Sequence, residues 1–112
     1  MSTDPFTYIW AYRVPSEGVD EFRSLYGPEG AWVRLFRQAA GYLDTVLYRD
    51  RNDRTRYVTI DRWESEQAFR GFRTRFAEDF ERLDTAGKHL TIEETPLGEL
   101  GPDYIGDQAL DP

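Results

Sequence analysis

Residues 55–83 read TRYVTIDRWESEQAFRGFRTRFAEDFERL, and this stretch decides the fold. Its first part, 55–63, is rich in β-branched and aromatic residues, which predicts a strand. Ser65 stands where a helix N-cap is expected. The helix that follows carries a single apolar stripe with offsets of 3, 4, 4 and 3 residues. The stripe consists of Phe69, Phe72, Phe76, Phe80 and Leu83. We therefore predict a strand followed by a long amphipathic helix that ends at Gly87.

The flanking sequence supplies further elements. Residues 42–50 form a second strand-like run, and the polar segment 51–54 between the two runs predicts a hairpin. An aromatic run over 6–14 ends at Pro15 and predicts a first strand. Two helical patterns follow over 16–27 and 29–40, and a last strand is expected over 88–97.

This order of elements is β-α-β-β-α-β. It predicts an α+β, ferredoxin-like fold in which a four-stranded antiparallel sheet has both helices on one face. The first strand is apolar on both of its sides, with Tyr8 and Trp10 on one side and Ile9 and Ala11 on the other. Because soluble monomers seldom expose an apolar patch larger than about 300–600 Å², we expect the uncovered face to meet a second copy in a homodimer.

Length and charge limit the function classes. The 112 residues suit one domain, which we expect over residues 1–98, with a C-terminal tail over 99–112. There are 21 acidic and 14 basic residues, a net charge of −7 that disfavours nucleic acid as a partner. No apolar stretch approaches the roughly 18–20 residues that span a bilayer, and no signal-peptide pattern is present. We therefore expect a cytoplasmic protein without a membrane partner.

The chain has no cysteine, which excludes disulfides, thiolate nucleophiles and Cys-type metal sites. His89 is the only histidine, and a single histidine is more often a surface residue than a ligand. We expect no metal and no cofactor.

Three segments together resemble the antibiotic biosynthesis monooxygenase family. They are the aromatic first strand, the segment YGPEGAWVRLFRQAAGYL over 26–43, and the run RYVTIDRWES over 56–65 before the Phe-rich helix. The resemblance covers about residues 6–98. It implies a dimeric α+β barrel in which each subunit keeps a pocket between its own sheet and helices. Relatives include cofactor-free oxygenases, haem degraders, isomerases and proteins of no known activity.

The resemblance singles out Trp63 as a candidate site residue. In relatives that oxidise aromatic polyketides, a Trp at the end of this strand lines the pocket, where an indole can stack on a flat ligand. The alternative is a Trp that plugs the end of the core. Monooxygenases of the family carry an Asn four residues earlier and a Tyr six residues later, where this chain has Thr59 and Phe69. Thr59 keeps one donor and Phe69 has none, which weakens stabilisation of an oxyanion or peroxide.

Haem chemistry is not expected. Haem degraders of this fold carry a proximal His about ten residues after the Trp, where this chain has Arg73, which cannot ligate iron. His89 lies beyond the helix.

Asp61 shares strand parity with Thr59 and Trp63, so its carboxyl is expected on the pocket side, where burial raises a carboxyl pKa towards that of a general base. Asp44 is a similar candidate, and a salt bridge to a neighbouring Arg is the favoured alternative for either. The expected pocket walls are Phe36, Phe69, Phe72 and Phe76, although aromatic residues at helical spacing are more often plain core.

These observations lead to two functional hypotheses. The first is a cofactor-independent monooxygenase that acts on a flat aromatic, such as a polyketide- or quinol-like small molecule, with Trp63, Thr59 and Asp61 as catalytic candidates. The alternative is a non-catalytic or differently catalytic barrel protein that binds a hydrophobic small molecule. An RNA-recognition module has the same order of elements, but strand 57–63 lacks its sequence signature and the net charge has the wrong sign.

Overall fold

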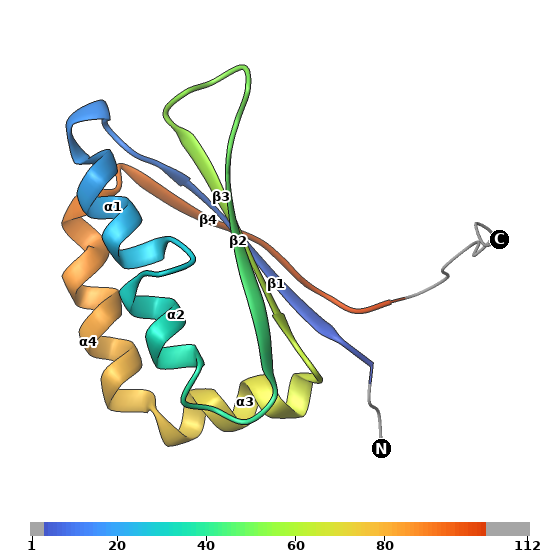
Figure 1. The fold of residues 1–112 in the computed structure, drawn as a ribbon. Helices are drawn as coiled ribbons and strands as arrows, with labels where there is room; N and C mark the ends of the chain where they lie inside the picture. The colour runs from blue at the N-terminus through green and yellow to red at the C-terminus, as the bar shows by residue number, and fades with distance from the viewer. Residues whose placement is uncertain (1–3, 103–112) are drawn as a thin grey trace, which may run out of the picture.

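The computed structural model describes residues 4–102, and in them one antiparallel sheet is covered on one face by helices (Figure 1). The four strands are β1 (Phe6–Arg13), β2 (Tyr42–Arg49), β3 (Arg56–Trp63) and β4 (Glu93–Leu100). The α-helices are α1 (Val19–Tyr26), α2 (Ala31–Phe36), α3 (Glu66–Arg75) and α4 (Ala77–Gly87). Short 3₁₀ turns at Ser16–Gly18 and Lys88–Leu90 complete the chain. The predicted α+β, ferredoxin-like fold is confirmed.

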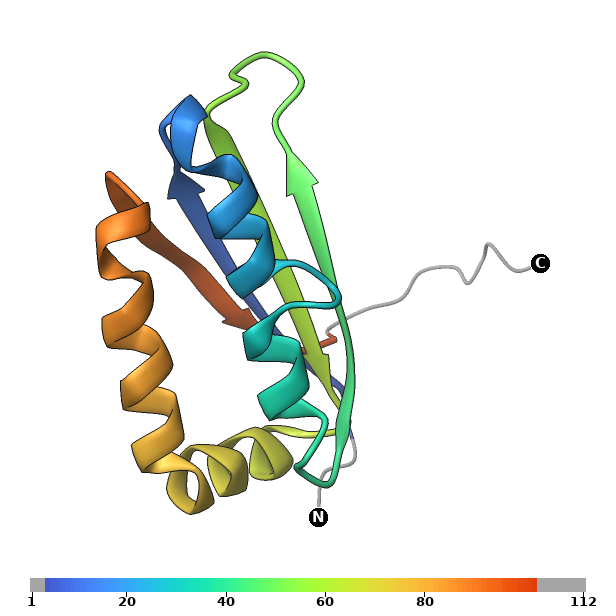
Figure 2. The same ribbon diagram turned by 60° about the vertical axis from the view of Figure 1, so that its left-hand side comes forward.

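The strands lie in the order β2-β3-β1-β4, and every neighbouring pair is antiparallel. All the helices lie on the same side of this sheet (Figure 2). Because successive side chains of a strand point to opposite faces, the even residues of β1 and the odd residues of β3 turn towards the helices. The register pairs Tyr8 with Asp61 and Trp10 with Thr59, so these side chains share the space under the helices.

The predicted helix after Ser65 begins where the sequence places it. The Ser65 side chain accepts a 3.1 Å hydrogen bond from the backbone N–H of Ala68, which is the expected N-cap. The single helix predicted up to Gly87 is wrong, because the chain breaks at Phe76, whose φ of −111° and ψ of 30° are not helical. As a result α3 covers one end of the sheet and α4 turns to run along it (Figure 1).

The last strand begins and ends later than predicted. Residues 88–90 form a 3₁₀ turn, and β4 runs from 93 to 100, past the predicted end of the domain at 98. Pro96 is tolerated inside β4 because β4 is an edge strand, where one missing N–H leaves no partner unsatisfied. Residues 103–112 of the predicted tail lie outside the described residues.

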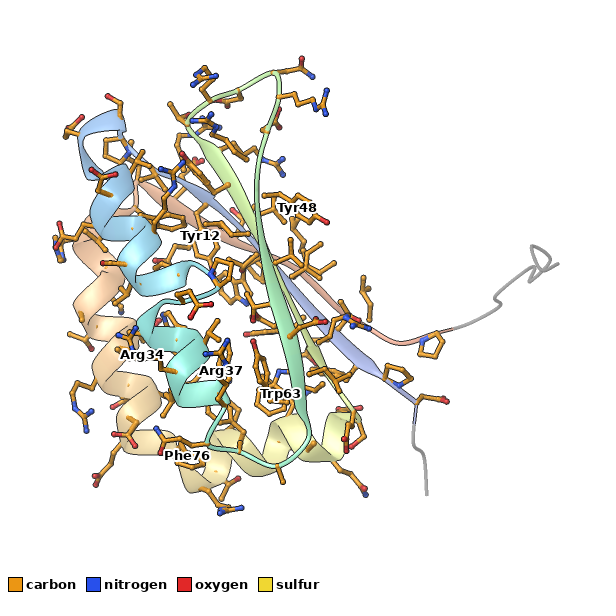
Figure 3. All side chains as sticks on the ribbon, viewed as in Figure 1. Tyr12, Arg34, Arg37, Tyr48, Trp63 and Phe76 are labelled. Atoms are coloured by element: carbon orange, nitrogen blue, oxygen red, sulfur yellow. The ribbon has the colours of Figure 1, made fainter. Side chains whose placement is uncertain are left out.

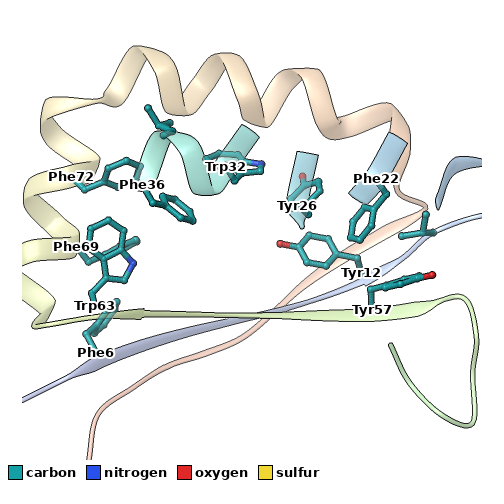
Figure 4. Packing of buried hydrophobic residues seen from close by; sticks show 12 residues of the cluster. Phe6, Tyr12, Phe22, Tyr26, Trp32, Phe36, Tyr57, Trp63, Phe69 and Phe72 are labelled. Carbon is teal, nitrogen blue, oxygen red and sulfur yellow. The ribbon is translucent and has the colours of Figure 1, made fainter. Parts of the chain in front are cut away.

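Aromatic rings dominate the core between the sheet and the helices (Figure 4). Trp63 is 0% exposed, and four rings surround it at centroid distances of 5.2–5.6 Å. These rings belong to Phe36, Tyr42, Phe69 and Phe72. Such ring pairs add about 0.5–1.5 kcal/mol each beyond the area they bury.

The other face of the sheet is uncovered and carries apolar side chains. Val46, Tyr48, Leu97 and Leu100 are between 39% and 54% exposed. Figure 3 shows Tyr48 on the side of the sheet away from the helices, opposite to Trp63 and Tyr12. No helix of the described residues is long and apolar enough to cross a bilayer.

Candidate functional site

A cavity of about 70 Å³ lies between the helix-facing side of the sheet and α1, α2 and α4, and it opens to solvent. Its wall consists mainly of aromatic rings from the first strand and the helices. The aromatic lining residues are Tyr8, Trp10, Tyr12, Tyr26, Trp32, Phe36 and Phe80. The polar lining residues are Thr45, Thr59, Asp61, Asp84 and Glu94. The cavity therefore combines stacking surfaces with carboxyl and hydroxyl groups.

Asp61 is a buried carboxyl in this wall. It lies on β3, paired with Tyr8 of β1 and Thr45 of β2, and is 7% exposed. The Thr45 hydroxyl donates a 2.6 Å hydrogen bond to Asp61 Oδ1. Burial raises the pKa of Asp61 to about 7, and the Thr45 hydrogen bond opposes the rise only in part. Asp61 therefore exchanges a proton near neutral pH, as a general base does.

A second hydroxyl orients the first. The Tyr42 hydroxyl lies 2.7 Å from Thr45 Oγ1, and because the single hydroxyl proton of Thr45 is given to Asp61, Tyr42 is the donor in this contact. Both side chains reach the same face although they are three residues apart. The register of β2 shifts between Tyr42 and Asp44, so Leu43 is an extra, bulged residue.

Thr59 forms the next polar contact along the wall. It is 3% exposed, and its hydroxyl lies 3.2 Å from the hydroxyl of Tyr12. Burial raises the pKa of Tyr12 well above its ordinary value, so this phenol remains protonated. The pair thus keeps two neutral hydroxyl groups at the cavity.

Trp63, the first candidate from the sequence, is not among the residues that line the cavity, and it lies buried beside it. Its indole Nε1 is buried and has no hydrogen-bond partner among the described residues. Figure 4 shows this nitrogen and the Tyr12 hydroxyl turned towards each other across the space below Phe36 and Trp32. A buried donor without an acceptor is costly, at about 1–3 kcal/mol, so a bound acceptor would relieve it.

The aromatic residues expected to form the pocket walls separate into two groups. Phe36 lines the cavity, whereas Phe69, Phe72 and Phe76 are absent from its lining. Phe69 packs between Phe6 and Trp63, at 5.1 and 5.6 Å. These three residues lie where α3 covers the end of the sheet, because the break at Phe76 separates them from α4.

The other titratable candidates lie elsewhere. Asp44 pairs with Arg62 at 2.6 Å, and the Arg62 guanidinium lowers the pKa of this carboxyl. The salt-bridge alternative therefore holds for Asp44, whereas Asp61 forms no ion pair with any described residue. His89 is exposed, 3.5 Å from Glu21. Across residues 4–102 no group of three or more His, Asp or Glu side chains is arranged to hold a metal ion.

Several site residues were not identified from the sequence. Thr45 was missed because strict alternation along β2 places Asp44, not Thr45, on the side of Tyr42. Tyr12 carries no signature of a functional residue in the sequence. Its partnership with Thr59 follows only from the register between β1 and β3.

Comparison with known proteins supports this architecture. The family model described as antibiotic biosynthesis monooxygenase matches residues 5–83. No curated protein sequence matches the chain.

Solved structures share the fold over nearly the whole chain. SnoaB from Streptomyces nogalater, a cofactor-independent oxygenase, is similar in a mutant form with a TM-score of 0.68 and 20% identity, over 92% of this chain and 97% of that one. Rv0793 from Mycobacterium tuberculosis has a TM-score of 0.71 and 16% identity, over 92% and 99%. PA3566 from Pseudomonas aeruginosa has a TM-score of 0.66 and 26% identity, over 93% and 98%.

Proposed function

Since the chain belongs to the antibiotic biosynthesis monooxygenase family, we propose that it is a cofactor-independent monooxygenase that oxidises an aromatic small molecule. The observation that carries this proposal is Asp61, a buried carboxyl with a pKa of about 7 in the wall of an aromatic cavity. A base with this pKa is half ionised at neutral pH and is matched to proton abstraction there. The structural likeness to a cofactor-independent oxygenase agrees with the reaction class.

The reaction proceeds on the electrons of the substrate. Asp61 accepts a proton from an activated CH₂ group of the aromatic substrate and leaves a carbanion delocalised over the ring. The carbanion gives its electron pair, one electron at a time, to O₂, and a C–O bond forms to yield a peroxide anion. Asp61 returns its proton to this anion. The hydroperoxide then loses water, so that CH₂ and O₂ become C=O and H₂O.

Charge is conserved inside the cavity during the first step. Before proton transfer Asp61 carries a negative charge, and afterwards the substrate carries it. Asp61 and the substrate are therefore never charged at the same time. This matters because two like charges in a buried site repel strongly. The neutral hydroxyl groups of Thr59 and Tyr12, together with the indole N–H groups of Trp32 and Trp63, which have no acceptor among the described residues, are donors for a developing oxyanion.

The size of the cavity limits which part of the substrate is enclosed. At about 70 Å³ it is roughly half of the 150 Å³ that holds a benzene molecule. The cavity is open on one side, so it encloses the reacting edge of the substrate while the remainder occupies the mouth. A single-ring or edge-on substrate suits this space better than a fully enclosed polycycle.

The proposal includes a homodimer. The uncovered face of the sheet presents Val46, Tyr48, Leu97 and Leu100, which are 39–54% exposed. A second copy packed against this face would bury them and would complete the barrel that the family resemblance implies.

Oxygen uptake tests the function. Purified protein is incubated with anthrones, which carry the activated CH₂ group that the reaction requires, and O₂ consumption and incorporation of ¹⁸O into the product are measured. We expect turnover that Asp61→Asn lowers by about 10²–10⁴-fold. Asp44→Asn is the matched control, since it removes a carboxyl from the same sheet that is paired with Arg62. Tight binding of these compounds without O₂ uptake would contradict the oxygenase and favour the ligand-binding alternative.

A further inference from the structure

The cavity has an unusual charge pattern for an aromatic pocket. Three carboxyl groups line it, those of Asp61, Asp84 and Glu94, and no Arg, Lys or His is among its lining residues. Asp84 and Glu94 form no ion pair with a described residue, whereas Asp44, Asp50, Asp53 and Glu99 each pair with an arginine. Within residues 4–102, the only hydrogen bond to the Glu94 carboxylate comes from the Thr91 hydroxyl, at 2.9 Å.

The carboxyl groups occupy different depths. Asp61 is 7% exposed, whereas Asp84 of α4 and Glu94 of β4 are half-buried, so the latter two lie nearer to the mouth. The carboxylates of Asp84 and Glu94 both raise the pKa of one phenol, that of Tyr26. Burial raises the pKa of Tyr26, and the negative charges of Glu94 and Asp84 raise it further. The helix layer and the sheet therefore each contribute one carboxylate to the cavity lining, Asp84 from α4 and Glu94 from β4.

Aromatic rings surround this negative mouth. The Tyr12 and Tyr26 rings are tilted by 52° at a centroid distance of 4.8 Å, and the Trp32 ring lies 6.3 Å from that of Tyr26. The faces of such rings attract cations, and desolvated cation–π contacts are worth up to about 2 kcal/mol. Rings and unpaired carboxylates together are the environment in which an ammonium group is stabilised.

Two guanidinium groups lie near the cavity without lining it. Arg73 packs over the Phe80 ring, with its guanidinium carbon 4.0 Å from the ring centroid. The positive charge of Arg37 opposes the rise in the pKa of Tyr42, a residue of the edge strand β2. Each therefore leaves the carboxylates of the mouth unpaired.

The inner end of the cavity suits a different chemical group on the ligand, namely a hydrogen-bond acceptor. The buried indole N–H of Trp63 has no acceptor and turns towards the cavity (Figure 4). A hydroxyl or carbonyl oxygen on the ligand would satisfy it. The ladder pairs Asp61 with Tyr8 and Glu94 with Tyr12, which separates the α-carbons of Asp61 and Glu94 by about 16 Å, two strand spacings across and four residues along. A ligand that contacts both ends is therefore elongated.

From these contacts we propose that the ligand is an oxygen-bearing aromatic with a protonated amine on a side arm, its ring edge at Asp61 and Trp63 and its ammonium group between Asp84 and Glu94. This inference rests on the proposed function only in taking the cavity as the substrate site. It names the substrate class: cationic phenols bind, and phenols that carry a carboxylate are repelled by the three carboxyl groups.

A matched pair of probes tests the inference without any oxidation step. Tyramine and 3-(4-hydroxyphenyl)propionate share a phenol ring and a two-carbon arm but carry opposite charges. Calorimetry under nitrogen at pH 7.5 and low salt is expected to give at least about tenfold tighter binding of tyramine. The Asp84→Asn/Glu94→Gln double variant is expected to lose this preference. Asp79→Asn is the control, since this carboxylate pairs with Arg82 on the same helix.

The outcomes separate this inference from the oxygenase proposal. Equal binding of the two probes, or a preference for tyramine that survives in the double variant, overturns the inference and leaves the oxygenase untouched. Preference for tyramine that the double variant loses supports it, even if no amine is oxidised. Circular dichroism of the double variant, together with binding of neutral 4-ethylphenol, verifies that the cavity is still formed.

Discussion

The hydroxyl of Thr45 donates a 2.6 Å hydrogen bond to Oδ1 of Asp61 across the β2–β3 pair. This contact fixes one oxygen of the carboxyl and leaves the other for a ligand. It also stabilises the ionised form, so it lowers a pKa that burial has raised. The position of the Asp61 pKa near 7 is thus the balance between burial and one hydroxyl group.

The pH dependence of turnover follows from this balance. Since the ionised form of Asp61 is the base, kcat/KM is expected to increase with pH and to level off above the pKa of about 7. Asp61→Asn should reduce kcat/KM by about 10²–10⁴-fold, the usual contribution of a general base. Oxygen uptake measured from pH 5 to 9 with a substrate that does not itself titrate checks this. A flat profile would show that Asp61 is not the base.

Removing the Thr45 hydroxyl should shift the pH dependence of turnover. Thr45→Val leaves the Asp61 carboxylate without its donor, so the pKa of Asp61 rises further and the midpoint of the activity profile shifts to higher pH. Thr45→Ser keeps the hydroxyl and is expected to retain the original midpoint. An unchanged midpoint in Thr45→Val would mean that the hydrogen bond does not tune Asp61.

Folding stability should change with pH in the opposite direction from activity. The pKa of Asp61 is raised in the folded state, so the folded protein binds more protons than the unfolded chain between about pH 4 and pH 7. The contribution of this group is fully present below pH 4 and is lost as pH rises through 7, by up to about 4 kcal/mol. Urea unfolding of wild type and Asp61→Asn at pH 5 and 8 measures it. The difference between the two proteins should move in favour of Asp61→Asn at pH 8.

Trp63 should prove both structural and functional. Because it is 0% exposed among four rings, Trp63→Ala is expected to cost about 3–5 kcal/mol of stability. Trp63→Phe keeps most of the volume and the fold but removes an N–H that has no acceptor among the described residues, so affinity for an oxygen-bearing aromatic ligand should fall by roughly 0.5–1.5 kcal/mol, the net contribution of one hydrogen bond. Calorimetry on the folded Trp63→Phe protein measures this change in ligand affinity. Unchanged affinity would leave Trp63 as packing alone.

The uncovered sheet face should govern the oligomeric state. We expect a dimer that buries at least about 1,200 Å². A Val46→Asp/Tyr48→Asp variant places two charges on this face and is expected to be monomeric in light scattering. Thr74→Asp adds a charge to the exposed side of α3 and should remain a dimer. Wild-type protein that is monomeric at micromolar concentration would contradict the dimer.

The sequence predicted those features that depend on local periodicity. Alternation along 57–63 placed Asp61 and Thr59 beside Trp63 on the helix side, and the register confirms it. Alternation failed at Leu43, because a bulge reverses the faces of β2 and exchanges Asp44 for Thr45 at the site. The sequence of β2 contains no pattern that predicts such a bulge. The break at Phe76 was missed for a related reason, since the apolar stripe continues through it without interruption.

The arrangement of the three tryptophans gives the protein an optical property. Trp10 and Trp32 line the cavity, and the indole nitrogen of Trp63 turns towards it, so every tryptophan of the chain lies at or beside the site. The intrinsic fluorescence of the protein therefore originates almost entirely from the cavity wall. A ligand that stacks on these rings, or a proton that leaves Asp61 next to them, will alter the emission directly. Tryptophan fluorescence therefore reports whether the cavity is occupied, and ligands can be screened without a label and without knowing the reaction.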